Sequence, residues 1–198
     1  MSTHRLLDFG LPILLFLLFF FFYNFGKISP SEMVKNTGLL SITLLGITLA
    51  VGPLSRIIPV LEPLKAHRKF WGITSFLVAL VHVGLVYVYF YKFDVTKFVN
   101  FAHPKYPGIL SGLLALVILF LVTMTSNQKA ITKLSPNIWK AIQLTSYLAM
   151  ALAVAHFYIM ETQNGILVIK RLLGQITFVF SILVIVLRVL ILLLPTKK

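Results

Sequence analysis

The sequence predicts an all-α, polytopic membrane protein: a six-transmembrane-helix bundle in a single membrane domain spanning residues 1–198. Of its 198 residues, 59% are hydrophobic and 12% are charged, whereas an ordinary soluble domain carries about 25% charged residues. The mean hydropathy is +0.96. Apolar runs of about 20 residues, the length that crosses a bilayer, recur along the chain. We therefore expect spans at residues 6–25, 38–60, 70–91, 109–125, 138–160 and 166–194.

The first three spans differ in how they begin and end. Residues 6–25 form an apolar stretch longer than the core of about 7 to 15 residues in a signal peptide, and no small-x-small cleavage site follows, so we expect a retained helix. The second span, residues 38–60, ends in Gly52-Pro53-Leu54-Ser55-Arg56, where the helix is expected to kink or fray. A polar hinge at residues 65–69 leads into the third span, residues 70–91, whose far end carries Tyr and Phe side chains suited to the headgroup region.

Loops separate the last three spans. His103-Pro104 and Pro107-Gly108 argue against any regular element in residues 92–107, before the fourth span at residues 109–125. A second loop covers residues 126–137, and its Ser135-Pro136-Asn137 is a start signal for the fifth helix, residues 138–160. Residues 161–165 then connect to the sixth span, residues 166–194.

The positive charge indicates orientation. Six spans place both termini on one side, and most of the 18 Lys and Arg residues fall on that side. The positive-inside rule then predicts cytoplasmic termini in the inner (plasma) membrane. The net charge is +13. Because the Lys and Arg residues that produce it lie between apolar spans, the expected partner is the lipid bilayer and not nucleic acid.

The residue types limit the redox chemistry that the chain can support. It has no cysteine, which excludes disulfides, thiolate zinc sites, iron–sulfur clusters and covalently attached c-type haem. Two of the five histidines, His82 and His156, lie inside apolar spans, where an ionisable side chain is costly and is a functional candidate by default. The other three lie in tails or loops and are explained by solvation: His4, His67 and His103.

His82 and His156 are expected to lie at one level, in the half of the bilayer away from the termini, because each helix rises 1.5 Å per residue. Small residues lie three and seven positions before each histidine, on the same helical face: Ala79, Ser75, Ala153 and Ala149. Two interpretations stay open at this point. The small residues leave a gap that holds a flat macrocycle between two ligands, or they let the helices pack closely while the histidines bond across the interface.

A series of short motifs then follows in a fixed order: Asn36-Thr37-Gly38, Thr48 to Leu54, Arg68-Lys69-Phe70-Trp71-Gly72, His82, Gly108 to Gly112, Thr123 to Ser126, Trp139-Lys140, Tyr147 and His156. This series resembles the ferric-reductase-like transmembrane family. Within that family it is most similar to the haem-binding membrane subunits of periplasmic methionine-sulfoxide reductase systems. The resemblance covers residues 38–160.

The resemblance implies a bundle that binds b-type haem between the third and fifth spans and passes electrons across the membrane. His82 matches the family's third-helix ligand, and His156 matches its distal fifth-helix ligand. The family's second fifth-helix histidine is replaced by Gln143. We therefore expect one haem, with two alternatives left open: His67 or another group acts as a substitute ligand, or the protein is a subunit of a larger assembly.

Two basic residues complete the expected site. Arg68 is the first of the family's paired arginines, and Lys69 replaces the second, which keeps the charge but not the bidentate geometry. If a haem lies at the level of the two histidines, its propionates can point towards Lys170 and Arg171 at the outer end of the sixth span, although the interpretation as ordinary interface anchors is favoured. The expected cofactor-binding residues are His82, His156, Ser75, Ala79, Ala149, Ala153, Arg68 and Arg171, with the metal held by His82 and His156.

These observations predict an integral membrane electron-transfer subunit with one non-covalent haem b, which takes electrons from a quinol or a partner reductase and passes them to an acceptor protein. The sequence contains no nucleotide-binding motif or flavin domain, so we expect no catalytic residue of its own and dependence on a redox partner. A quinone or a flavin is a further candidate cofactor. The alternative is a haem-free structural or accessory subunit of a larger membrane complex; a transporter is disfavoured because the spans hold few acids.

Overall fold

The computed structural model describes the backbone of residues 3–193 and the side chains of residues 6–193. Within that part of the chain, six helical segments are long and apolar enough to cross a membrane, which confirms the predicted fold class. The predicted end of the last span, Leu194, lies outside the described residues. The elements in chain order are α1 (Thr3–Leu18), η1 (Phe19–Tyr23), α2 (Pro30–Ile57), η2 (Pro59–His67), α3 (Arg68–Leu85), η3 (Val86–Phe90), η4 (Val95–Val99), α4 (Tyr106–Met124), α5 (Gln128–Lys133), α6 (Pro136–Leu144), α7 (Ser146–Glu161), β1 (Thr162–Gln163), β2 (Ile166–Leu167) and α8 (Leu172–Leu193).

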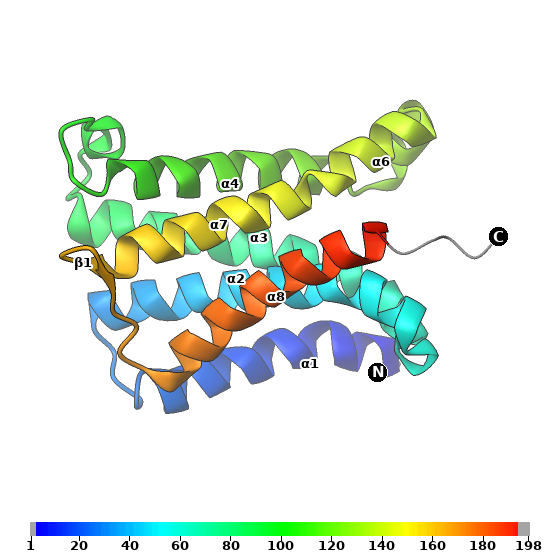
Figure 1. Ribbon diagram of the computed structural model, residues 1–198, viewed down its shortest axis with the longest axis horizontal. Coiled ribbons are helices and arrows are strands. Elements are labelled where there is room, and N and C mark those ends of the chain that lie inside the picture. The colour runs from blue at the N-terminus through cyan, green and yellow to red at the C-terminus, as the bar shows by residue number, and fades with distance from the viewer. Residues whose placement is uncertain (1–2, 194–198) are drawn as a thin grey trace.

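The helices run roughly along one common direction, so that the bundle has two distinct ends. α1 begins and α8 ends at the same end, which we call the terminal side (Figure 1). The short antiparallel pair β1–β2 lies at the other end, which we call the hairpin side. An even number of spans requires this placement of the termini.

α2 is the central helix of the bundle. Of its most apolar 18-residue window 67% is buried, against 11% for α1, and it packs against both α3 and α8. The helix begins at Pro30, well before the predicted start at residue 38, because the Ser29 side chain accepts a hydrogen bond from Glu32 N and Pro30 suits the first turn. It also continues through Pro53 to Ile57, so the expected fraying at Gly52-Pro53 does not end it.

Several stretches that the sequence presents as irregular are helical turns. The polar hinge, residues 65–69, is helical throughout: its first three residues end η2, a 3-10 helix, and its last two begin α3. The two predicted loops contain η4 and α5, because Asp94 and Asn127 each accept a hydrogen bond from a main-chain N–H two or three residues ahead. Such local caps nucleate short helices that apolar periodicity does not reveal.

The last two spans also differ from the expected boundaries. The fifth span is divided into α6 and α7, which meet at Thr145. The sixth span begins at Leu172 instead of residue 166, because Asn164 and Gly165 have φ values of 50° and 79° and form a two-residue turn between β1 and β2. Asn-Gly is a preferred sequence for such a turn.

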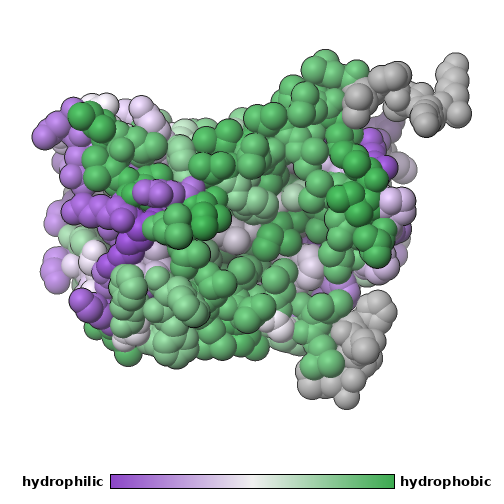
Figure 2. Space-filling view, turned by 60° about the horizontal axis from the view of Figure 1, so that its bottom comes forward, coloured by the Kyte–Doolittle hydropathy of each residue, from purple (hydrophilic) through white to green (hydrophobic). Residues whose placement is uncertain are grey.

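The surface agrees with immersion in a bilayer. Figure 2 shows hydrophobic side chains over the middle of the molecule and hydrophilic ones gathered toward its ends. Large apolar side chains remain exposed on the outer helices; Leu14 is 62% exposed and Val117 is 56% exposed. In water such a surface would promote aggregation, whereas in lipid it needs no protein cover.

Candidate functional site

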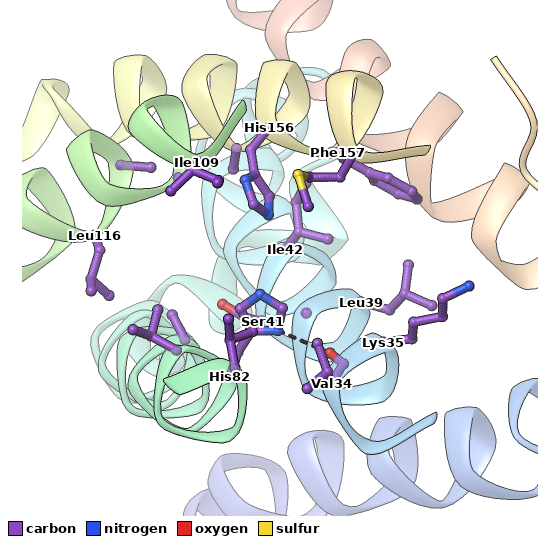
Figure 3. A pocket seen from close by; sticks show the side chains of 18 of the residues that line it. Val34, Lys35, Leu39, Ser41, Ile42, His82, Ile109, Leu116, His156 and Phe157 are labelled. Atoms are coloured by element: carbon purple, nitrogen blue, oxygen red, sulfur yellow. Dashed lines mark hydrogen bonds between the residues drawn. The ribbon is translucent and has the colours of Figure 1, made fainter. Parts of the chain in front are cut away.

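A cavity of about 420 Å³ lies between α2, α3, α4 and α7, and it reaches residues of the hairpin side. Its lining is largely apolar and includes side chains such as Ile42, Leu116 and Phe157 (Figure 3). The two histidines of the membrane spans, His82 from α3 and His156 from α7, both line it. The structure therefore brings the two predicted ligands into one cavity.

The ring of His82 is held against α2. Its Nδ1 lies 2.9 Å from the Val34 carbonyl oxygen, which can only accept, so Nδ1 carries the proton and donates. Figure 3 shows this bond as a dashed line between the two residues. A Cβ on Gly38, one turn after Val34, would lie 3.2 Å from both Cε1 and Nδ1 of His82. The glycine thus provides the space that the ring occupies.

His156 is held against α4 in the same way. Its Nδ1 donates to the Gly108 carbonyl oxygen at 2.8 Å. A Cβ on Gly112, one turn after Gly108, would lie 2.7 Å from His156 Nδ1, closer than a real Cβ contact allows. Each histidine is therefore fixed by a carbonyl of a neighbouring helix and by the glycine four residues after that carbonyl.

The two rings face each other across the cavity. Their centroids are 6.2 Å apart, and their planes are almost perpendicular, at 89°. Because Nδ1 of each ring donates to a carbonyl, a neutral imidazole keeps its lone pair on Nε2, the atom that a metal would take. A metal–imidazole bond of about 2.0 Å puts the ring centre about 3 Å from the metal, so two ligands on opposite sides have centres about 6 Å apart. The observed spacing fits one metal ion between the rings.

The number of possible protein ligands also indicates whether a bare metal ion or a haem fits the cavity. Among the described residues, no group of three or more His, Cys, Asp or Glu side chains could hold a metal ion. A bare structural zinc ion takes four protein ligands, whereas a haem iron receives four ligands from its macrocycle and needs two from the protein. Two facing imidazoles therefore suit a haem and not a bare ion.

The small residues near the histidines divide into two pairs. Ala79 and Ala153, three positions before the histidines, line the cavity. Ser75 and Ala149, seven positions before them, do not. The Ser75 hydroxyl donates to the Ser41 carbonyl at 2.8 Å, and the Ser41 hydroxyl donates to the Ser75 carbonyl at 2.9 Å, so α2 and α3 are in close contact there. Ala149 is fully buried in the main apolar core.

Neither predicted arginine reaches the cavity. The Arg171 guanidinium donates to both carboxylate oxygens of Glu32 at 2.5 Å and also to the Tyr23 carbonyl. Arg68 lies near the terminal side, where its Nε donates to the Thr48 carbonyl at 2.8 Å. Among the described residues, Lys35 is the Lys or Arg whose side chain lines the cavity, and it lies on the same α2 face as Gly38.

Lys35 was not among the expected site residues. Its ammonium lies 3.9 Å from a Glu161 carboxylate oxygen, and both residues line the cavity. The sequence did not mark Lys35, because the helical face that it shares with Gly38 is tied to the site only by the contact between Gly38 and the His82 ring. Gly38 and Gly112 themselves appeared only as parts of motifs.

Two further polar residues have partners elsewhere. The Gln143 amide donates to the Val122 carbonyl at 3.3 Å and to the hydroxyls of Thr125 and Ser126, at the end of α4 and just beyond it. The expectation that His67 is solvated in a loop is wrong, because it is buried at the end of η2 on the terminal side, where its Nδ1 is 2.7 Å from an Asp8 carboxylate oxygen of α1. Neither residue lines the cavity that holds His82 and His156.

Comparison with known proteins identifies a family and several relatives. The chain matches the family described as ferric reductase like transmembrane component over residues 37–154, a stretch that includes His82 and ends just before His156. It is 31% identical over 135 residues to the protein-methionine-sulfoxide reductase heme-binding subunit MsrQ of Polaromonas naphthalenivorans. It is 28% identical over 134 residues to the MsrQ of Herminiimonas arsenicoxydans.

These alignments cover 67% of this chain and 60% and 61% of the two MsrQ proteins, so the chain spans about three fifths of their length. The magnetosome protein MamZ of Magnetospirillum gryphiswaldense is 29% identical over 143 residues, which is 72% of this chain and 22% of that protein. The family match extends over more than half of the chain and covers α3, α4 and parts of α2 and α7. The chain therefore belongs to the ferric reductase-like transmembrane component family.

Proposed function

We propose that this protein is a membrane electron-transfer subunit that carries one non-covalent b-type haem between His82 and His156. The observation that carries the proposal is the pair of facing imidazoles, 6.2 Å apart, whose Nδ1 atoms are both engaged by main-chain carbonyls. That arrangement leaves both Nε2 atoms available as ligands. Two relatives are named as heme-binding subunits, which supports the same cofactor.

The residues around the rings would each have a distinct task. The Val34 and Gly108 carbonyls set the tautomer and orientation of the two imidazoles, a support that metal-ligating histidines generally need. The small side chains of Ala79 and Ala153 leave space between α3 and α7, so that a flat group fits between the two helices. Lys35 offers a cation for a propionate in place of the expected Arg171. When bound, a haem with two protein ligands supplies one-electron transfer and leaves no position for oxygen.

The surroundings of Gln143 support a single haem. Its amide points toward the α4 end and has hydrogen-bond partners there. The reciprocal serine bonds between α2 and α3 close the space below the cavity on the terminal side. A second macrocycle in that region would have to break these contacts and would lack its histidine.

Electrons would enter from a quinol, a flavin or a partner reductase and leave to an acceptor protein. The membrane location follows from the six spans, and the relatives' names indicate a reductase subunit. We propose the inner membrane, with cytoplasmic termini, as the site of action because most basic residues fall on the terminal side. In that orientation the cavity lies toward the periplasmic surface, where the acceptor would dock.

A haem-free structural role is the second candidate, and one observation favours it. Each histidine already donates a hydrogen bond to a neighbouring helix, which is how polar side chains bond helices together in membranes. That role predicts a colourless purified protein that co-purifies with a larger complex.

The reduced optical spectrum separates the two candidates. Protein produced with sufficient haem supply should show the sharp alpha band of a six-coordinate b-type haem, and the pyridine haemochrome assay should give one haem per chain. His82→Ala and His156→Ala should each lose or convert the spectrum, whereas His103→Ala, an exposed loop histidine, should not. A colourless wild type, or unchanged spectra in both ligand variants, would refute the proposal; two haems per chain would refute the interpretation of Gln143.

A further inference from the structure

The Gly52-Pro53 pair in α2 frees backbone groups on the terminal side, away from the haem cavity. Proline has no N–H, so the carbonyl four residues earlier, that of Leu49, has no helical donor. The Tyr147 hydroxyl from α7 donates to this carbonyl at 3.0 Å. The break in the α2 hydrogen-bond pattern therefore anchors a side chain from another helix.

Arg68 is anchored one residue earlier. Its Nε donates to the Thr48 carbonyl at 2.8 Å. The guanidinium lies over Gly52, because a Cβ there would be 3.0 Å from Nη1 and 3.3 Å from Cζ. Among the side chains of residues 6–193, no acceptor is bonded to Nη1 or Nη2 of Arg68. Two N–H-bearing nitrogens of a half-buried guanidinium are therefore available.

Two more arginines approach the same place. Arg188 from α8 stacks on Tyr147, with Cζ 5.0 Å from the ring centroid. Tyr147 and Arg68 bond to the carbonyls of adjacent α2 residues, Leu49 and Thr48. Arg56 lies one helical turn after Gly52, over which the Arg68 guanidinium lies. We call Arg56, Arg68 and Arg188 the terminal arginine cluster.

This cluster has no counter-charge within the described part of the chain. The protein has five acidic residues, and each has partners elsewhere: Asp8 with His67, Glu32 with Arg171, Glu62 with Lys65, Asp94 with Thr96, and Glu161 with Lys35. Like charges held close together and partly out of water are costly unless an anion joins them. Within residues 6–193 no carboxylate neutralises the cluster, so its guanidinium groups can bind an anion supplied by another molecule.

We propose that the terminal arginine cluster binds the phosphate of an anionic phospholipid. The cluster lies at headgroup depth: Arg56 is next to the end of α2, Arg68 is the first residue of α3, and Arg188 is about 7.5 Å of helix before Leu193. Beside Arg188, Val189 is 50% exposed and Leu190 is 54% exposed, as residues in contact with acyl chains are.

The chemistry of the cluster suits this ligand. Guanidinium groups bind phosphate through paired N–H donors, and basic pockets between transmembrane helices bind acidic headgroups. A phosphodiester with attached acyl chains would be held by both the arginines and the exposed apolar face of α8. The site is separate from the haem cavity and does not depend on the proposed redox function.

The test counts bound lipid on the full-length protein. Wild type in nanodiscs that contain phosphatidylcholine and phosphatidylglycerol should retain phosphatidylglycerol in native mass spectra after delipidation. Arg68→Gln/Arg188→Gln should weaken that binding about tenfold or more, the effect of losing charge-assisted hydrogen bonds. The control Lys129→Gln/Lys133→Gln removes two exposed charges from α5 and should bind as wild type does.

Further measurements distinguish the phosphate of an anionic lipid from that of other sources. Equal retention of phosphatidylcholine, or full displacement by inorganic phosphate at millimolar concentration, would overturn the lipid assignment. Equal phosphatidylglycerol binding by the double arginine variant would overturn the site itself. If that variant does not fold, Arg188→Gln alone must still weaken binding; this change removes a partly buried guanidinium that stacks on the Tyr147 ring.

Discussion

Replacement of Gly112 by alanine tests the proposed haem site through one added methyl group. The new Cβ would lie 2.7 Å from His156 Nδ1 and 3.2 Å from both Cγ and Cε1. An ordinary contact needs about 3.5 Å, so the ring or α4 must retreat by roughly 0.8 Å. Overpacking of this kind costs about 1–3 kcal/mol, which weakens haem binding by between about fivefold and about a hundredfold if it falls on the ligand.

Two other glycines provide a graded comparison. At Gly38 the added Cβ would be 3.2 Å from His82, so we expect a smaller loss than at Gly112. At Gly84, in the same helix as His82, nothing lies within 4 Å, and Gly84→Ala should bind haem as wild type does. All three changes share the gain in helix propensity from Gly to Ala, so differences between them report the contact with the histidine.

The assay is titration of apo-protein with haem in detergent, followed by the reduced spectrum and the thermal midpoint of each variant. The expected order of haem affinity is Gly84→Ala, then Gly38→Ala, then Gly112→Ala. If Gly112→Ala binds haem with wild-type affinity and an unchanged low-spin spectrum, His156 does not hold the iron in the geometry described here. A loss at Gly84→Ala equal to that at Gly112→Ala would also contradict the argument.

Three further predictions address other parts of the molecule. Lys35→Gln should shift the haem midpoint potential or lower its occupancy, whereas Arg171→Gln should lower only the thermal midpoint; a larger redox effect at Arg171 would reverse the propionate assignment. Gln143→His should leave the pyridine haemochrome stoichiometry at one haem per chain, because the side chain at that position is directed toward the α4 end. Tyr147→Phe should cost about 1–3 kcal/mol of unfolding free energy, since it leaves the Leu49 carbonyl unpaired. The cost should shrink in a Pro53→Ala background, where alanine restores the helical N–H; equal costs in the two backgrounds would contradict this account.

The sequence predicted the helices well because hydrophobic length is a local property. Each span had to reach about 20 apolar residues, and that requirement alone identified all six. The boundaries were less accurate where caps and turns decided them. Ser29 extends α2 toward the N-terminus, and the Asn164-Gly165 turn delays the start of α8.

For the candidate site too, the sequence identified some residues correctly and misplaced others. His82 and His156 were identifiable because an ionisable residue in an apolar span is rare, and the structure places both in one cavity. The assignment of Arg171 to that cavity rested only on its position at the outer end of a span. In the structure Glu32, distant in sequence, holds its guanidinium in a bidentate pair.

By itself, the sequence determined the membrane location, the number of spans and the two histidines that are the candidate ligands, because these depend on composition and on residue type within each helix. Only the tertiary structure decided that Gly38 and Gly112 make room for the two rings, that Lys35 faces the cavity, and that Gln143 is bonded at the α4 end. These features depend on which faces of different helices meet. The rotation and depth of a transmembrane helix are set by packing against its neighbours, so residues far apart in the chain define them together.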